Sequence, residues 1–107
     1  MKKQYKIVVY VPVHNADMLR EHMGNAGAGI IGNYSHCTFS TTGIGRFKPL
    51  EGANPTLGEV GRLEEAVEER IETVCSEEKL QDVLRVIKNM HPYEEPATDI
   101  YLLEKFY

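Results

Sequence analysis

The residues best equipped for chemistry lie in one short segment, His91-Pro92-Tyr93-Glu94-Glu95-Pro96. An imidazole, a phenol and two carboxylates follow one another there, between prolines that restrict the backbone. A histidine beside carboxylates can bind a divalent cation or transfer protons near neutral pH. A structural role fits the pattern equally well, because His91 would lie at the negative end of a preceding helix and Tyr93 would anchor the turn. Both interpretations stay open, and both rank above a catalytic role.

A metal site in this segment would need more ligands than His91 with Glu94 or Glu95. His36 is the obvious partner if the strand that carries it meets this loop. Since His36 and Cys37 are adjacent on an expected strand, their side chains point to opposite faces and cannot both join one site. The cofactor is unknown from the sequence, and a divalent metal ion is the one that this pattern favours.

A second candidate site is the run Gly43-Ile44-Gly45-Arg46-Phe47-Lys48. Flexible backbone N–H groups at its glycines, next to Arg46 and Lys48, could hold a phosphate or a carboxylate. The run lies in an expected connection over residues 41–61, and connections of this length are usually functional or mobile. The favoured alternative is a solvated hairpin loop, or a loop that packs on a neighbouring subunit through Phe47.

The run Gly27-Ala28-Gly29-Ile30-Ile31-Gly32 matches the GxGxxG pattern of dinucleotide-binding sites. In those sites the pattern follows a strand and opens a helix, whose N-terminus binds the pyrophosphate. Here it closes a helix and leads into a strand. We therefore predict a structural crossover in which Gly29 and Gly32 adopt positive φ angles, rather than a nucleotide site.

The composition disfavours several classes of function. The chain has 107 residues, which suits one domain over residues 1–107, and its formal net charge is −4. A negative chain without a basic cluster disfavours binding to nucleic acid or to an anionic membrane, since both need a positive field. Two cysteines without CxxC spacing, and no secretion signal, predict a cytoplasmic protein. No base is tied to a serine or cysteine by a recognisable motif, so we expect no enzymatic activity.

Hydrophobic periodicity indicates the elements that carry these candidates. The apolar, β-branched run over residues 5–11 predicts a buried strand with neighbours on both sides, which ends at Pro12. A helix should follow, capped by Asn15 and stopped by the glycines from Gly24 onward.

The rest of the chain repeats this order. Alternation over residues 34–40 predicts a second strand. Ser76 is a good N-cap for a second helix, which ends before Pro92. Residues 98–106 alternate around apolar positions as the last strand.

Residues 66–75 are ambiguous, because their apolar positions fit a helix as well as a strand. We interpret them as a strand, which places Glu69 among apolar neighbours. An acid in that position predicts a basic partner, Arg70 or Arg62 of another subunit. The other acids of this region are expected to form a solvated strip: Glu64, Glu65, Glu68 and Glu72.

The resulting order is strand, helix, strand, long loop, strand, helix, strand. It predicts an α+β, ferredoxin-like βαββαβ fold, in which two helices cover one face of a four-stranded, mainly antiparallel sheet. The other face of the sheet is left open, and a second copy of the chain is the simplest cover for it.

Five blocks of residues resemble the small domain inserted in the middle of YqfO-type dinuclear-metal proteins, here expected as a standalone protein. The blocks cover nearly the whole chain in order: Val11-Pro12, Gly27 to Tyr34, Gly43 to Pro49, Glu69 to Glu72 and His91 to Pro96. The resemblance implies a PII/CutA-like fold, whose members associate as trimers through their sheets. PII proteins use a long loop at the position of residues 41–61 to read nucleotides. The metals of the parent proteins are held by the two flanking halves, so none of those ligands carries over to this chain.

We therefore expect a small cytoplasmic, homotrimeric binding or regulatory module that holds a metal ion or a small anion at subunit clefts. The alternative is a purely structural trimer that binds no ligand. The candidate ligand-binding residues are His36, Gly43, Gly45, Arg46, Lys48, His91, Tyr93, Glu94 and Glu95. The sequence leaves open whether residues 41–61 contact a ligand or a neighbouring subunit.

Overall fold

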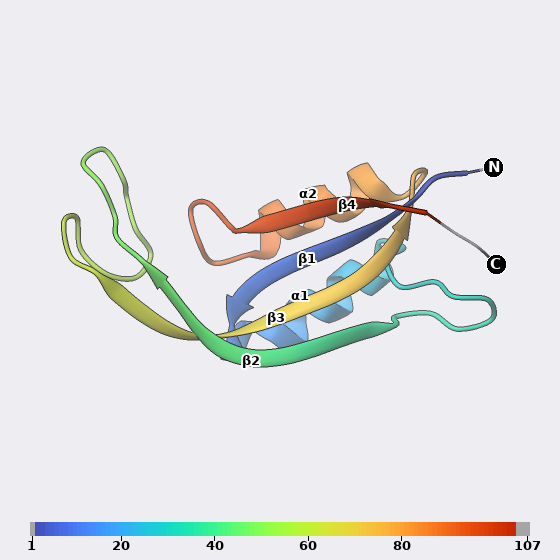
Figure 1. The fold of residues 1–107 in the computed structure, drawn as a ribbon, viewed down its shortest axis with the longest axis horizontal. Coiled ribbons are helices and arrows are strands. Elements are labelled where there is room, and N and C mark those ends of the chain that lie inside the picture. The colour runs from blue at the N-terminus through green and yellow to red at the C-terminus, as the bar shows by residue number, and fades with distance from the viewer. Residues whose placement is uncertain (1, 105–107) are drawn as a thin grey trace.

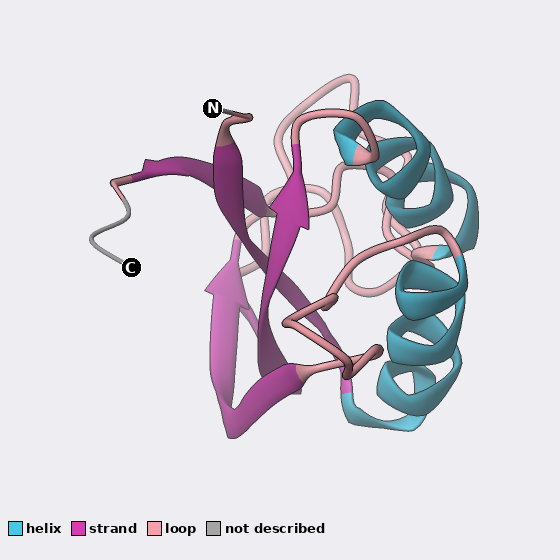
Figure 2. Cartoon of the chain, turned by 90° about the vertical axis from the view of Figure 1, so that its right-hand side faces the viewer, coloured by secondary structure: helices cyan, strands magenta, loops and turns pink. Residues whose placement is uncertain are grey.

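The computed structural model describes residues 2–104, and Figure 1 shows their arrangement. The elements follow in the order β1 (Gln4–Pro12), α1 (Val13–Asn25), β2 (Thr38–Phe47), β3 (Glu64–Ser76), α2 (Leu80–Met90) and β4 (Thr98–Leu103). The four strands form one sheet in the order β2-β3-β1-β4, and every neighbouring pair is antiparallel. Both helices cover the same face of the sheet (Figure 2). The predicted α+β, ferredoxin-like βαββαβ fold is confirmed.

The core lies between the sheet and the two helices. On β1, Ile7, Val9 and Val11 face the helices and are completely buried, since alternate residues of a strand share a face. Leu19 of α1 and Val83 of α2 belong to the same buried cluster. Removing such side chains from water is the main stabilising contribution in a small domain. None of the described helices is long and apolar enough to cross a membrane.

Both helices begin elsewhere than the sequence predicted. α1 starts directly after Pro12, so Asn15 lies inside the helix rather than at its cap. Ser76 is the last residue of β3, where it pairs with the first residue of β1. A turn closed by the Lys79 N–H group and the Ser76 carbonyl oxygen (3.1 Å) then leads into α2. Pairing between strands holds both Pro12 and Ser76 in the sheet, and a local capping rule does not take that pairing into account.

β2 begins later than predicted, at Thr38 rather than residue 34, so His36 and Cys37 are not on a strand; it also ends later, and the loop after it is shorter. The predicted loop over residues 41–61 is a strand up to Phe47, so the connection to β3 covers residues 48–63. Gly43 and Gly45 are paired with β3 along this stretch. β3 is 13 residues long and offers ladder partners that hold these glycines in a strand despite their low strand propensity.

β3 confirms the strand interpretation of residues 66–75 but changes the partner of its unusual acid. Glu69 points toward α1, where its carboxylate pairs with Arg20 of the same chain. The predicted pairing of Glu69 with an arginine of another subunit is therefore wrong. The last strand was predicted to reach residue 106, which lies outside the described residues; β4 ends at Leu103.

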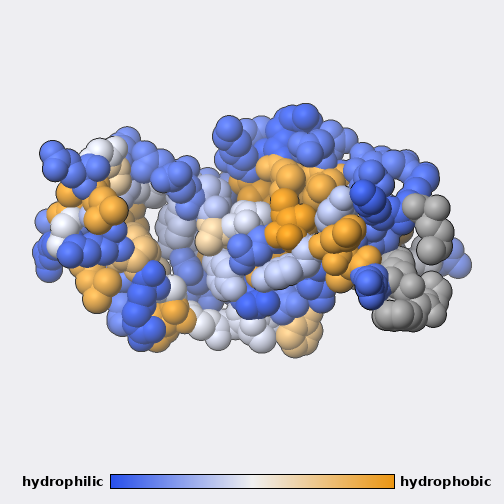
Figure 3. All heavy atoms as spheres, turned by 45° about the horizontal axis from the view of Figure 1, so that its top comes forward, coloured by the Kyte–Doolittle hydropathy of each residue, from blue (hydrophilic) through white to orange (hydrophobic). Residues whose placement is uncertain are grey.

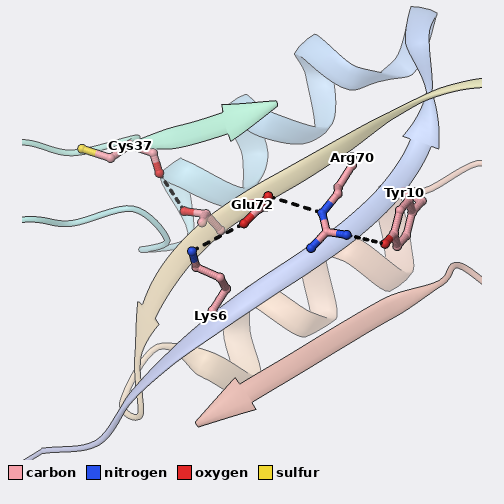
Figure 4. Close-up of polar contacts among 6 residues, drawn as sticks. Lys6, Tyr10, Cys37, Arg70 and Glu72 are labelled. Atoms are coloured by element: carbon pink, nitrogen blue, oxygen red, sulfur yellow. Dashed lines mark hydrogen bonds and ion pairs between the residues drawn. The ribbon is translucent and has the colours of Figure 1, made fainter. Parts of the chain in front are cut away.

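The face of the sheet opposite the helices carries a polar network (Figure 4). Lys6 of β1 lies 3.5 Å from the Glu72 carboxylate of β3, and Arg70 donates a hydrogen bond to the same carboxylate at 3.3 Å. Arg70 also donates to the Tyr10 hydroxyl oxygen at 3.0 Å. Phe39 of β2, which pairs with Glu72, is 66% exposed. Within the described part of the chain, no helix or strand packs over this network.

Candidate functional site

A cleft of about 450 Å³ lies between the loop over residues 48–63 and the end of the sheet. Figure 3 shows the hollow between this loop and the rest of the molecule. The cleft is mainly apolar, with a few polar side chains from β2, β3 and the loop that follows α2. It brings together six of the nine predicted ligand-binding residues: Gly45, Arg46, Lys48, Tyr93, Glu94 and Glu95.

Two loops that are far apart in the sequence are tied together to form the walls of the cleft. The Asn54 N–H group donates to both oxygens of the Glu94 carboxylate, at 3.2 and 3.3 Å. The Thr56 hydroxyl group donates to the Pro92 carbonyl oxygen at 2.7 Å. These bonds fix the 48–63 loop against the loop after α2, so the cleft is held open by the chain itself.

His91 ends α2 and lies beneath the cleft, only 6% exposed. Its Nδ1 atom accepts a hydrogen bond from the Tyr93 N–H group at 3.0 Å, so Nε2 must carry the proton and donate to the Tyr10 carbonyl oxygen at 2.6 Å. Burial lowers the pKa of His91, which favours this neutral ring. Neither nitrogen has a lone pair free for a metal ion. The geometry supports the structural interpretation of His91, and the proposed metal ligation is not compatible with it.

Two adjacent polar groups in the cleft have no ion-pair or hydrogen-bond partner outside the pair among the described residues. The Tyr93 hydroxyl oxygen is buried and makes no hydrogen bond to any described residue outside this pair. Glu68 lines the cleft and is 8% exposed, yet no nitrogen of a described Lys, Arg or His lies within 4.0 Å of its carboxylate. Burial raises the pKa of Tyr93, and the adjacent Glu68 carboxylate, an acceptor within reach of the Tyr93 hydroxyl group, raises it further. Buried polar groups are normally satisfied, so this pair calls for an explanation.

Gly45 provides the space that Glu68 occupies. A Cβ atom at Gly45 would lie 2.0 Å from Glu68 Oε1, whereas a Cβ at Gly43 would have no described atom within 4 Å. Both glycines are ladder residues of β2, so the flexible glycine cradle for an anion that the sequence suggested is not formed. Arg46 Nε donates to Glu65 Oε2 at 2.7 Å. Lys48 is the other basic side chain that lines the cleft, and it has no carboxylate within 4.0 Å among the described residues.

The crossover between α1 and β2, which contains His36, lies at the other end of the sheet from the 48–63 loop (Figure 1). The His36 Nε2 atom is 2.9 Å from Asn25 Oδ1, and its Nδ1 atom is 2.9 Å from Ser35 Oγ. The ring covers Gly24, where a Cβ atom would lie 2.1 Å from it. The predicted partnership of His36 with His91 is therefore wrong, because α1 and the crossover after it place His36 elsewhere. No group of three His, Cys, Asp or Glu residues in the described chain is arranged to hold a metal ion.

Glu68 is the functional candidate that the sequence missed. It was assigned to the solvated acidic strip, and its burial depends on which strand residues face the loop after α2. One signal for it exists in the sequence: Gly43 and Gly45 alternate on the strand that pairs with β3. Alternating glycines leave one face of a strand without side chains, so that a large neighbour can lie across it.

The crossover that resembled a nucleotide motif is structural, as predicted. Gly29 and Gly32 have φ angles of +82° and +55°. The Gly29 N–H group donates to the Val74 carbonyl oxygen at 2.7 Å, and the Gly29 carbonyl oxygen accepts from the Cys37 N–H group at 2.9 Å. This run therefore anchors the chain between α1 and β2.

No protein-family profile matches the chain. The chain is 52% identical over 99 residues to a protein of Halalkalibacterium halodurans named GTP cyclohydrolase 1 type 2 homolog. It is 52% identical over 100 residues to the protein of the same name from Bacillus subtilis. The matches cover 92% and 94% of this chain but 27% of each relative. The chain thus spans about a quarter of the length of these relatives, and the activity in their name is that of the whole proteins.

Solved structures agree with this placement. A Bacillus cereus protein related to NIF3 matches 97% of this chain with 26% of its own, at a TM-score of 0.85 and 45% identity. CutA from Archaeoglobus fulgidus matches with a TM-score of 0.71 at 18% identity, over 97% of this chain and 87% of CutA. GlnK of Bacillus subtilis matches with a TM-score of 0.59 at 15% identity, over 95% of this chain and 86% of GlnK. At such identities the last two show the fold alone. The chain is a PII/CutA-like domain of the kind contained in the larger, NIF3/YqfO-like proteins named GTP cyclohydrolase 1 type 2 homolog.

Proposed function

We propose that this chain is a self-associating binding module that holds a small molecule in the cleft beside the 48–63 loop. One observation carries the proposal: residues from two segments that the sequence singled out separately line the same cavity. Gly45, Arg46 and Lys48 come from the end of β2, and Tyr93 to Glu95 come from the loop after α2. Ligand sites are typically concave, mainly apolar and equipped with a few converging polar groups, and their volumes are roughly 300–1,000 Å³.

Self-association is proposed on the basis of the open sheet face. Phe39 and Tyr101 lie on this face and are 66% and 51% exposed. Exposed apolar surface and unpaired strand edges favour pairing with another copy of the chain. The resemblance to PII and CutA proteins supports a homotrimer, in which the cleft would lie near a boundary between subunits. Light scattering at micromolar concentration should give the mass of a trimer, and a monomer mass would refute this part of the proposal.

A trimer that binds no ligand is the second candidate, and one feature favours it. Ile44 and Val67 form a cross-strand pair on the part of the β2–β3 hairpin that extends beyond the helices, and they are 56% and 58% exposed. Such a pair suits contact with a neighbouring subunit. In this case the 48–63 loop would serve assembly alone.

A change in melting temperature on addition of ligand separates the two candidates, since a ligand that binds only the folded state stabilises it. The probes are nucleotides, phosphate, small carboxylates, small amines and divalent metal salts. Gly45→Val should abolish any shift, because its side chain would displace Glu68 from its place in the cleft. Gly43→Val is the matched control, since a Cβ atom there meets open space.

The expected result is a shift with at least one class of probe that survives in Gly43→Val and disappears in Gly45→Val. No shift with any probe, or equal shifts in both variants, would leave the ligand-free trimer as the better description.

A further inference from the structure

The buried carboxylate of Glu68 distinguishes the floor of the cleft from the rest of β3. Three other acids of this strand have a basic partner within 4.0 Å: Glu65 with Arg46, Glu69 with Arg20, and Glu72 with both Lys6 and Arg70. Glu68 is the most buried acid of the strand and has no such partner among the described residues. An unpaired carboxylate in this position costs free energy of folding unless something else supplies the positive charge.

We propose that Glu68, with the Tyr93 hydroxyl group beside it as a donor, binds the protonated amino group of a small organic molecule, an inference that rests on the proposed binding function of the cleft. An ammonium group offers three N–H donors and one positive charge. Glu68 would accept a charge-assisted hydrogen bond from it, while the Tyr93 hydroxyl group, which is closed off from solvent, donates to the same carboxylate. One ligand would then supply the positive charge that Glu68 lacks among the described residues.

The walls of the cleft favour an organic cation over a metal ion. The Phe47 and Tyr93 rings lie 5.9 Å apart and both line the cleft. Aromatic faces attract an alkylammonium group through cation–π interaction and pack against its carbon atoms. Hard divalent cations instead require about six or more oxygen ligands or ordered waters, and His91, the nearest imidazole, has both nitrogens in use.

The charges of the cleft also favour a cation over an anion. Three carboxylates line it, from Glu68, Glu94 and Glu95, against two basic side chains. One of those two, Arg46, is already engaged by Glu65. Glu94 accepts hydrogen bonds from the Asn54 N–H group, which fix its carboxylate at the wall of the cleft.

The test is a calorimetric titration of the parent protein with butylammonium and putrescine at pH 7, with 1-butanol as a neutral probe of similar size and shape. Both ammonium probes should bind and butanol should not. Glu68→Gln should weaken binding by about tenfold or more, and Tyr93→Phe by less, because the first change removes the charge that binds the ammonium group and the second only a neighbouring donor to that carboxylate. Glu69→Gln is the control: it removes the neighbouring charge, which lies on the opposite face of β3 and is paired with Arg20.

The inference would be overturned if butanol bound as well as butylammonium, or if Glu68→Gln bound the ammonium probes as tightly as the parent. A nucleotide or phosphate that binds in the cleft while the ammonium probes do not would overturn this inference and leave the proposed function intact. Absence of binding by every class of probe would overturn both.

Discussion

The two ends of the sheet look alike in sequence but differ in how their polar groups are used. Each end has a histidine close to the C-terminus of a helix and a nearby pair of glycines. At the crossover end, His36 contacts Asn25 and Ser35 through its two nitrogens, and Gly29 packs against the backbone of Cys37. At the cleft end His91 is equally well bonded, but the Tyr93 hydroxyl group above it has no partner other than Glu68 among the described residues.

This difference is a better guide to function than the motifs are. The crossover carries a pattern known from nucleotide sites, yet its glycines serve packing and turning, and no space is left at Gly29. The cleft carries no recognised motif, yet it keeps open volume and a carboxylate without a basic partner among the described residues, beside a buried hydroxyl group. Polar groups that the fold does not satisfy by itself are where a ligand is expected.

The largest effect is expected at the crossover, from Gly29→Ala. A Cβ atom there would lie 2.5 Å from the Cys37 backbone nitrogen, and the φ angle of +82° disfavours any side chain. We expect a loss of about 3–4 kcal/mol in the free energy of unfolding, measured by urea denaturation. Gly32→Ala is the matched control, with positive φ but open space, and should cost about 1 kcal/mol. Equal costs for the two variants would show that close packing at Gly29 is unimportant.

The second-largest loss of stability is expected from replacing His91 at the cleft end of the sheet. His91→Ala should lower the free energy of unfolding by about 2–3 kcal/mol, because it leaves the Tyr10 carbonyl oxygen and the Tyr93 N–H group without their partner. The loss should be the same with and without added zinc. A metal-dependent stabilisation of the parent that vanishes in the variant would restore the metal interpretation.

The lowered pKa of His91 predicts that the stability of the protein depends on pH. Burial lowers the pKa of folded His91 below its ordinary value of 6.5, so below pH 6.5 the unfolded chain binds the proton more readily than the folded chain. The contribution of neutral His91 to the free energy of unfolding is therefore complete above pH 6.5, and it is lost as the pH falls through the pKa of the folded state. His91→Gln should flatten this part of the stability profile between pH 7 and 5; an unchanged profile would place the titrating group elsewhere.

Tyr93→Phe is expected to change the stability of the protein only slightly, in contrast to the losses predicted above. The change removes a buried hydroxyl group whose only polar partner among the described residues is the adjacent Glu68 carboxylate, so the free energy of unfolding of the ligand-free protein should stay within about 1 kcal/mol of the parent. A loss well above this, by the same urea assay, would indicate that the hydroxyl group has another structural partner in solution.

The sequence predicts the fold well because local patterns decide it. Apolar alternation on β1 and helical spacing on α2 survive into the structure, since each element must bury one continuous apolar face. The extent of β2 could not be predicted, because Gly43 and Gly45 carry loop signals and only pairing with β3 keeps them extended. The site was predicted in part: Tyr93 and Lys48 reach the cleft, whereas the burial of Glu68 depends on a bend of the sheet and on a loop 25 residues further along the chain.

The most direct test of the account compares two adjacent carboxylates that lie on opposite faces of one strand. Glu69 is paired with Arg20, so Glu69→Gln should lower the free energy of unfolding by about 1–2 kcal/mol. Glu68 has no basic partner among the described residues, so Glu68→Gln should leave the ligand-free protein as stable as the parent or stabilise it by about 1 kcal/mol. Urea denaturation of both variants in ligand-free buffer at pH 7 measures this difference. A loss for Glu68→Gln as large as that for Glu69→Gln would contradict the account, since Glu68 would then serve the fold rather than a ligand.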